Sequence, residues 1–165
     1  MSFFCTLLES PLGKLYIETN TEALQKVLFW DEKPIPTLSL LEDCPAIMHQ
    51  TLHALQQYFS NDLHVFDLPI HWTVGTAFQQ RVWQELCKIP YGTTISYAFL
   101  AHRLNDPLCI RAAASANGKN PIAIIVPCHR VIGSKGELTG YAGGLHRKKW
   151  LLQHEKGLVE NTLFG

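Results

Sequence analysis

The segment SYAFLAHRLNDPLCIRAAASANG, residues 96–118, decides the fold of the second half of the chain, because it predicts two short helices joined by a tight turn. Ser96 can cap the first helix with its hydroxyl. Asp106 can cap the second helix, Pro107 suits its first position, and Gly118 ends it. Two helices arranged in this way are typical of a helix-turn-helix, a motif that places its second helix against DNA.

The second of these helices has an unusual composition for a helix that reads DNA sequence. It carries Arg111, Ser115 and a run of alanines that begins at Ala112. Reading bases in the major groove needs side chains that make paired hydrogen bonds, and this helix offers few of them. Small residues instead allow close approach to a backbone or to a shallow minor groove. A helix packed in the core is the alternative, but an unpaired guanidinium such as that of Arg111 is costly to bury.

A reactive cysteine is predicted in the segment PIAIIVPCHRVIG, residues 121–133. Its apolar run suggests a buried strand that delivers Cys128 at its end, followed by His129 and Arg130. A structural cysteine needs no basic neighbours, whereas cationic or imidazole neighbours favour the thiolate, which is the nucleophilic form. The pattern therefore favours a nucleophile.

The composition of the whole chain is that of an ordinary globular protein. Its 165 residues are 47% hydrophobic and 17% charged, enough apolar mass to bury a core. No apolar run reaches the roughly 20 residues that span a bilayer, and the amino terminus lacks the features of a signal peptide. Five scattered cysteines without a C-x-x-C pair argue against a disulfide scaffold or a structural zinc. These features predict no membrane association, no metal and a reducing, cytoplasmic location.

The formal net charge of zero conceals an uneven distribution. Residues 1–74 hold three lysines and nine carboxylates, a charge of −6. Residues 75–165 hold the other 11 basic side chains and five carboxylates, a charge of +6. This asymmetry suggests that the second half meets a polyanion. The alternative is that the two halves attract each other.

The first half predicts a small antiparallel sheet with one helix. The segments FFCTLLE, KLYIETN and LQKVLFW are strand-like, and apolar residues recur at helical spacing in AIMHQTLHALQQYF, residues 46–59. His49 and His53 are four residues apart in that helix, but no third metal ligand is suggested. A capping box at Thr76 begins the helical second half, so we place a boundary near residue 75. The predicted fold is α+β: an amino-terminal antiparallel sheet with a helix, then a helical, winged-helix-like domain with a helix-turn-helix.

Six short blocks resemble one known family. The blocks GTAFQQRVW, IPYGTTISY, GKNP, VPCHRVIG, LTGYAGGL and KKWLLQHE stand in the order and spacing of the O-6-alkylguanine-DNA alkyltransferases, also called methylated-DNA–protein-cysteine methyltransferases. The resemblance covers residues 75–157, and the length suits the bacterial stand-alone form. It implies a ribonuclease-like structural domain over 1–74 and a DNA-binding, alkyl-transfer domain over 75–165.

The resemblance also implies roles for five catalytic residues. Cys128 resembles the thiol that accepts the alkyl group, and His129 the general base that deprotonates it through a water molecule. Neighbouring residues on an extended chain point apart, which makes direct contact between these two side chains difficult. Glu155 resembles the carboxylate that orients the imidazole. Tyr97 resembles the residue that hydrogen-bonds the guanine ring, and Asn120 the polar link between the helix-turn-helix and the cysteine strand.

Further residues resemble the family's DNA-binding and pocket residues. Arg111 resembles the arginine that fills the base stack after the damaged nucleotide has flipped out. The other predicted DNA contacts are Ala112, Ser115 and Lys119. The predicted substrate pocket comprises Tyr141, Ala142 and Gly143. We expect Arg130 to form a structural ion pair and Arg147, Lys148 and Lys149 to be surface charge.

The implied function is repair of O-6-alkylguanine, and of O-4-alkylthymine, in double-stranded DNA of any sequence. An S-alkyl thioether is not readily hydrolysed, so each monomer is expected to act once and to need no cofactor. Two alternatives remain at this point. The chain could be a DNA-binding protein in which Cys128 is inert, or a cysteine hydrolase that uses Cys128 and His129.

Overall fold

A computed structural model of the protein describes residues 2–31 and 33–156. The chain divides into two compact units. Among the described residues, the first unit comprises 2–31, 33–74 and the short segment 121–123, and the second comprises 75–120 and 124–156. The α+β class predicted from the sequence is confirmed. None of the described helices is long and apolar enough to cross a membrane.

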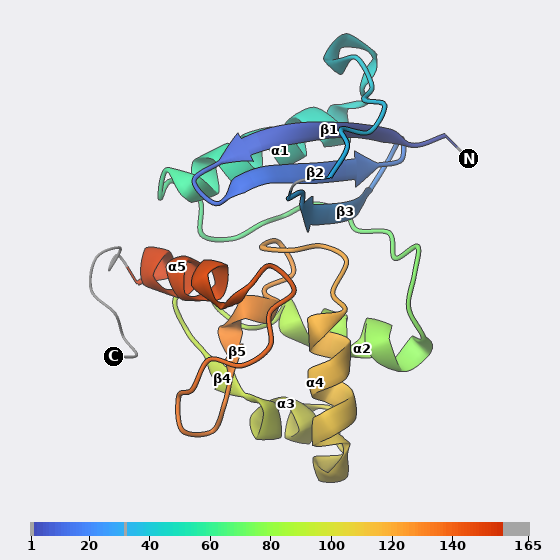
Figure 1. Ribbon diagram of the computed structural model, residues 1–165. Helices are drawn as coiled ribbons and strands as arrows, with labels where there is room; N and C mark the ends of the chain where they lie inside the picture. Colours follow the sequence, from blue (N-terminus) through green and yellow to red (C-terminus); the bar gives the residue numbers. More distant parts are fainter. Residues whose placement is uncertain (1, 32, 157–165) are drawn as a thin grey trace. The chain divides into compact units, whose positions relative to one another are not determined.

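The first unit is a three-stranded antiparallel sheet covered by a helix (Figure 1). Strands β1 (Phe4–Ser10), β2 (Gly13–Thr19) and β3 (Leu24–Phe29) pair in sequence order, as predicted. Helix α1 (Ala46–Phe59) contacts all three strands, after a 3₁₀ turn, η1 (Leu41–Asp43). The core of this unit is fully buried and consists of the side chains of Leu15, Ile17, Leu24, Val27, Met48, Leu55 and Tyr58.

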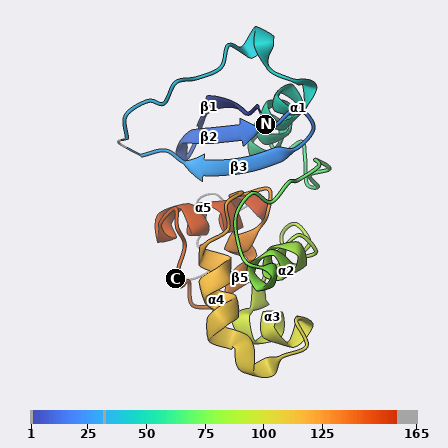
Figure 2. The same ribbon diagram turned by 90° about the vertical axis from the view of Figure 1, so that its right-hand side faces the viewer.

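The second unit is mostly helical (Figure 2). Its elements, in order, are α2 (Ala77–Leu86), β4 (Ile95–Ser96), α3 (Tyr97–Arg103), the 3₁₀ turn η2 (Pro107–Cys109), α4 (Ile110–Gly118), the 3₁₀ turn η3 (Cys128–Arg130), β5 (Val131–Ile132) and α5 (Leu145–Glu155). Helix α4 contacts both α2 and α3, and β4 pairs with β5 in parallel.

The predicted caps form. The Thr76 side chain accepts from the amide of Gln79 in a complete capping box that begins α2. The Ser96 hydroxyl accepts from the amide of Phe99 at the start of α3. The Asp106 carboxylate accepts from the amide of Leu108, so the chain turns first through η2 and then enters α4. The start of the second predicted helix is therefore a 3₁₀ turn, and the α-helix begins three residues later than the Pro107 signal predicts.

The buried strand predicted before Cys128 does not form. Only Ile122 makes a ladder contact, an isolated parallel bridge to Val27 in the first unit. Ile124 then adopts a left-handed conformation with φ 71°, which is rare for a β-branched residue and cannot continue a strand. The segment 121–130 is nevertheless buried throughout. The apolar run correctly predicts that the segment is buried, but the segment forms a turn and not a strand.

Candidate active site

Two consecutive tight turns present Cys128. Pro127 has φ −83° and ψ 63°, and the amide of Cys128 donates to the carbonyl of Val126 at 2.8 Å. These values define an inverse γ-turn centred on Pro127. The chain then enters η3, so Cys128, His129 and Arg130 lie on a 3₁₀ turn and not on an extended strand.

The thiol of Cys128 is protonated at rest, because its surroundings disfavour the thiolate. The residue is 7% exposed, and burial raises the pKa of the thiol. A hydrogen bond with the Asn120 side chain and the positive charge of Lys148 act in the opposite direction but do not outweigh burial. Formation of a thiolate at Cys128 would therefore need a nearby base.

His129 is placed to be that base. Its Nε2 lies 2.6 Å from Oε2 of Glu155, and both side chains are fully buried. Burial lowers the pKa of His129, although the Glu155 carboxylate partly counteracts this, so the imidazole is neutral. Since Nε2 donates to the carboxylate, Nδ1 carries the lone pair. Nδ1 is buried and has no hydrogen-bond partner among the residues that the structure describes.

Glu155 connects three groups through its two oxygens. Besides His129, it accepts from Arg130, whose Nε lies 2.8 Å from Oε1 and whose Nη2 lies 3.0 Å from Oε2. The amide of Gly92 also donates to Oε1. Burial opposes ionisation of Glu155, but His129 and Arg130 outweigh it and hold the pKa of this carboxyl well below its usual range. The prediction that Arg130 forms a structural ion pair is confirmed.

Asn120 and a second asparagine join α4 to the turn that carries Cys128. Asn120 Nδ2 donates to the carbonyl of Val126 at 2.8 Å. Asn117 Nδ2 donates to the carbonyl of Cys128 itself at 3.3 Å. Sequence reasoning selected Asn120 but missed Asn117, because an asparagine near a helix end is ordinarily a cap or a turn residue.

Lys148 is buried, so the prediction that it is surface charge is wrong. Its Nζ donates to the carbonyls of Val131 at 2.6 Å and Thr139 at 2.8 Å. Burial lowers the pKa of Lys148 to about 8, against an opposing effect of Cys128. The ammonium also lies 5.8 Å from the centroid of the Tyr97 ring, and the Tyr97 hydroxyl donates to the same carbonyl of Thr139. Lys148 and Tyr97 therefore meet at one acceptor.

Arg147 is also buried, which corrects the same prediction for that residue. Its Nη1 donates to the carbonyl of Gly143, a predicted pocket residue. Gly144 has φ 93° and its amide donates to the carbonyl of Tyr141, so the chain folds back between these residues. Burial raises the pKa of Tyr141 well above its ordinary value, while Ala142 is exposed.

Helix α4 has an exposed face and a buried face. The predicted DNA-binding residues Arg111, Ala112 and Ser115 are exposed on the helix, and the fourth, Lys119, is exposed directly after its last residue. The buried face carries Ala113, Ala116 and Asn117. Leu108, in η2 before the helix, is 94% exposed and was not predicted as a contact. Proteins that bind the minor groove can insert exposed apolar side chains between base steps, which makes Leu108 a candidate contact.

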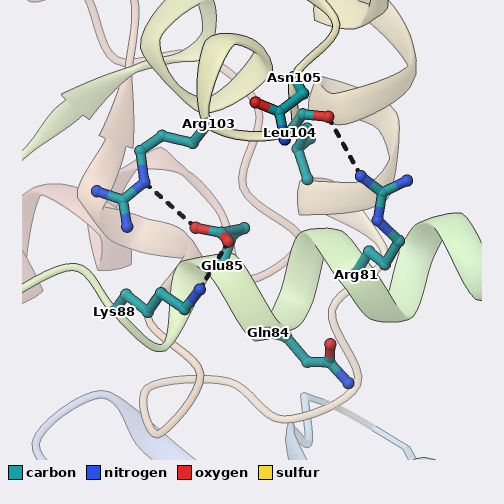
Figure 3. Close-up of a pocket in the computed structure, with 7 residues that line it drawn as sticks. All are labelled: Arg81, Gln84, Glu85, Lys88, Arg103, Leu104 and Asn105. Atoms are coloured by element: carbon teal, nitrogen blue, oxygen red, sulfur yellow. Dashed lines mark hydrogen bonds and ion pairs between the residues drawn. The ribbon is translucent and has the colours of Figure 1, made fainter.

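A surface cavity of about 240 Å³ lies on α2 and α3 and contains none of the predicted site residues (Figure 3). Glu85 forms ion pairs there with Lys88 and Arg103, and Arg81 donates to the carbonyl of Leu104. No group of three or more potential metal-binding side chains (His, Cys, Asp or Glu) occurs within residues 2–31 and 33–156.

The second unit of this α+β fold thus brings together a buried cysteine, a neutral imidazole and a buried carboxylate. Two family models match the chain. Residues 77–157 match the DNA-binding domain of 6-O-methylguanine DNA methyltransferase, and residues 3–72 match the ribonuclease-like domain of the same family. The chain belongs to the methylated-DNA–protein-cysteine methyltransferase family, which confirms the resemblance seen in the sequence.

Individual relatives are similar over nearly their whole length. The methylated-DNA–protein-cysteine methyltransferase of Mycobacterium tuberculosis is 42% identical over 159 residues, covering 95% of this chain and 96% of the relative. That of Methanosarcina barkeri is also 42% identical, covering 95% and 97%. The crystal structure of the M. tuberculosis O6-methylguanine methyltransferase superposes with a TM-score of 0.84, at 39% identity and 98% coverage of both chains. A structure of the M. tuberculosis OGT in complex with DNA superposes with a TM-score of 0.81, at 41% identity, covering 92% of this chain and 91% of that one.

Proposed function

We propose that this protein repairs DNA by transferring an alkyl group from O6 of guanine to Sγ of Cys128, once per molecule. The observation that carries the proposal is the pairing of a buried thiol with a neutral imidazole in the next position. His129 holds its Nε2 on Glu155 and leaves Nδ1 able to take a proton. The similarity to methyltransferases named for this reaction supports the same conclusion.

The reaction begins with the proton of the thiol. His129 Nδ1 takes it, directly or through one water molecule, and the resulting imidazolium is stabilised by the ionised Glu155. Arg130 keeps that carboxylate ionised and fixed, so Glu155 orients the imidazole without taking the proton itself. The Cys128 thiolate then attacks the alkyl carbon. A C–S bond forms, the C–O6 bond breaks, and its electron pair leaves with the guanine.

The departing guanine needs a proton or a positive charge to accept that electron pair. Tyr97 can provide the proton and Lys148 the positive charge. The two side chains lie close together, since each donates to the carbonyl of Thr139. We assign Tyr97 as the hydrogen-bond donor to the guanine ring and Lys148 as the cation that lowers the cost of removing the Tyr97 proton. The loop over Tyr141, Ala142 and Gly143 would hold the base.

Access to Cys128 requires the base to leave the duplex, because a buried thiol cannot reach a stacked base. The exposed face of α4 supplies the surface for this step. Its alanines permit close approach to the minor groove, Lys119 can contact phosphate, and Arg111 can fill the space that the flipped nucleotide leaves. Because the face has few side chains that read base edges, binding would be independent of sequence. We add Leu108 to this interface as an apolar contact.

Single turnover follows from the product. The S-alkyl cysteine is a thioether, and the site offers no second nucleophile for its removal. The same displacement would act on O-4-alkylthymine, needs no cofactor and can be completed by a monomer. The five free thiols support a reducing cytoplasm as the place of action.

A titration tests the proposal. Protein is mixed with increasing amounts of duplex that carries one tritiated O-6-methylguanine, and the label bound to protein is counted. We expect the label to plateau at one methyl per protein and a second addition of duplex to add none. Cys128→Ser should take up no label while still binding duplex. Continued release of demethylated DNA beyond one equivalent would contradict single turnover.

A further inference from the structure

Asn117 is the side chain of α4 that touches the backbone of the nucleophile. It is 1% exposed and lies on the buried face of the helix. Its Nδ2 donates to the carbonyl of Cys128. Arg111 and Ser115 lie on the exposed face of the same helix. One nine-residue helix therefore carries the DNA-binding surface on one side and a direct bond to the reactive residue on the other.

Two side-chain hydrogen bonds attach the carboxyl-terminal end of α4 to the turn that carries Cys128. Asn120 donates to the carbonyl of Val126, the first residue of the inverse γ-turn. Asn117 donates to the carbonyl of Cys128, the last residue of that turn. A buried hydrogen bond from Trp83 Nε1 to the carbonyl of Ala116 joins the same end of α4 to α2. A small displacement of this helix end would therefore rotate the peptide plane between Cys128 and His129, which sets the direction of both side chains.

Burial of the Asn117 side-chain amide costs free energy, which argues against a role in packing alone. Its Oδ1 is buried and has no hydrogen-bond partner among residues 2–31 and 33–156. Burying a polar atom without a partner is unfavourable, and an apolar side chain at this position would avoid that cost. The Asn117 side chain instead donates a hydrogen bond from Nδ2 to the carbonyl of Cys128.

We propose that Asn117 is a positioning residue that couples duplex binding on α4 to the reactivity of Cys128. DNA held on the exposed face fixes the helix, and Asn117 transmits that restraint to the Cys128 carbonyl, so the thiol and His129 are aligned when a duplex is bound. The inference rests on the proposed function. It differs from the linking role of Asn120, because Asn117 acts on the nucleophile itself.

The test compares two substrates of one thiol. Free O-6-methylguanine base would offer the same alkyl group without engaging α4, whereas a duplex with one O-6-methylguanine would engage it. Single-turnover rates are measured with each, the duplex at saturating concentration, for wild type, Asn117→Leu and Asn117→Asp. Both variants keep the branching of the side chain at Cγ and remove the donor. Asn61→Asp is the matched control, since it makes the same change at an exposed position in the first unit, outside the helix-turn-helix segment.

We expect Asn117→Leu and Asn117→Asp to lower the duplex rate about tenfold or more, the effect of one lost hydrogen bond, and to change the free-base rate by less than about threefold. The control should change neither rate. Should Asn117→Leu unfold, the smaller change Asn117→Ser gives the same comparison. Equal losses for both substrates, or no loss, would overturn the coupling. Failure of wild type to take up alkyl from either substrate would instead refute the proposed function.

Discussion

Glu155 Oε2 lies within hydrogen-bonding distance of two cationic or potentially cationic nitrogens, His129 Nε2 at 2.6 Å and Arg130 Nη2 at 3.0 Å. One carboxylate at the end of α5 therefore fixes both residues that follow Cys128. Under the proposed function it orients the imidazole of the base, and in the fold it neutralises a buried guanidinium. These two functions can be separated by experiment.

Replacing Glu155 with glutamine should impair both stability and alkyl transfer. The change leaves Arg130 without its ionic partner in a buried site, which costs about 3–5 kcal/mol of unfolding free energy. It also removes the charge that stabilises the imidazolium, so the transfer rate per folded molecule should fall by about 10-fold or more. Urea unfolding and single-turnover rates measure the two effects. Glu137→Gln, an exposed carboxylate in the same unit, should change the unfolding free energy by less than about 0.5 kcal/mol.

Stability should fall as the pH is lowered, in two steps. Burial holds the pKa of His129 below its ordinary value of 6.5, so the unfolded chain takes up a proton first as the pH falls through 6.5. His129 and Arg130 overcome burial to depress the pKa of Glu155 below 4.5, so the stability from this carboxylate is present above pH 4.5 and declines below it. Unfolding free energies at pH 7.5, 5.5 and 4 measure the decline. A constant value over this range would refute the assigned charge states.

Lys148 should promote thiol reactivity. Its positive charge lowers the pKa of Cys128, and that effect should disappear in Lys148→Met and, in wild type, as the pH rises through about 8. We expect Lys148→Met to react with iodoacetamide at Cys128 about threefold to tenfold more slowly at pH 7.5, since the pKa of the thiol rises. Lys149→Met, at the neighbouring half-buried position, should react at the wild-type rate. Equal rates for Lys148→Met and wild type would remove Lys148 from the site.

Leu108 and Lys119 should contribute to duplex affinity in distinguishable ways. Lys119→Ala removes a phosphate contact, so the slope of log affinity against log salt concentration should become shallower by about 1. Leu108→Ala removes an apolar contact, so affinity should fall about threefold to tenfold with an unchanged slope. Fluorescence anisotropy with an undamaged duplex at several salt concentrations measures both. An unchanged affinity for Leu108→Ala would exclude this side chain from the interface.

The sequence predicted most elements, because their signals are local. The caps at Thr76, Ser96 and Asp106 depend on a side chain and an amide two or three residues away, and all three form. The prediction of a strand before Cys128 is wrong because the backbone geometry there has no local signal. An apolar run reports burial but not backbone geometry, and the left-handed turn at Ile124 has no local sequence signal.

The candidate site residues show the same difference between local and long-range signals. The Cys128–His129 pair is adjacent in the chain, and the family resemblance supplied Glu155. Lys148 was mistaken for surface charge because a run of basic residues is usually solvated, yet Lys148 shares its helical face with Leu151, Leu152 and Glu155, all buried. Asn117 could not be found from local patterns, because its partner is a backbone carbonyl 11 residues away.

The most direct measurement is the intact mass of the protein after it is mixed with an excess of duplex that carries one O-6-methylguanine. The account predicts a gain of a single methylene unit, located at Cys128 by peptide mapping, with no further gain at longer times and no gain in Cys128→Ser. An unchanged mass with duplex binding intact, or a methyl group at another residue, would contradict it.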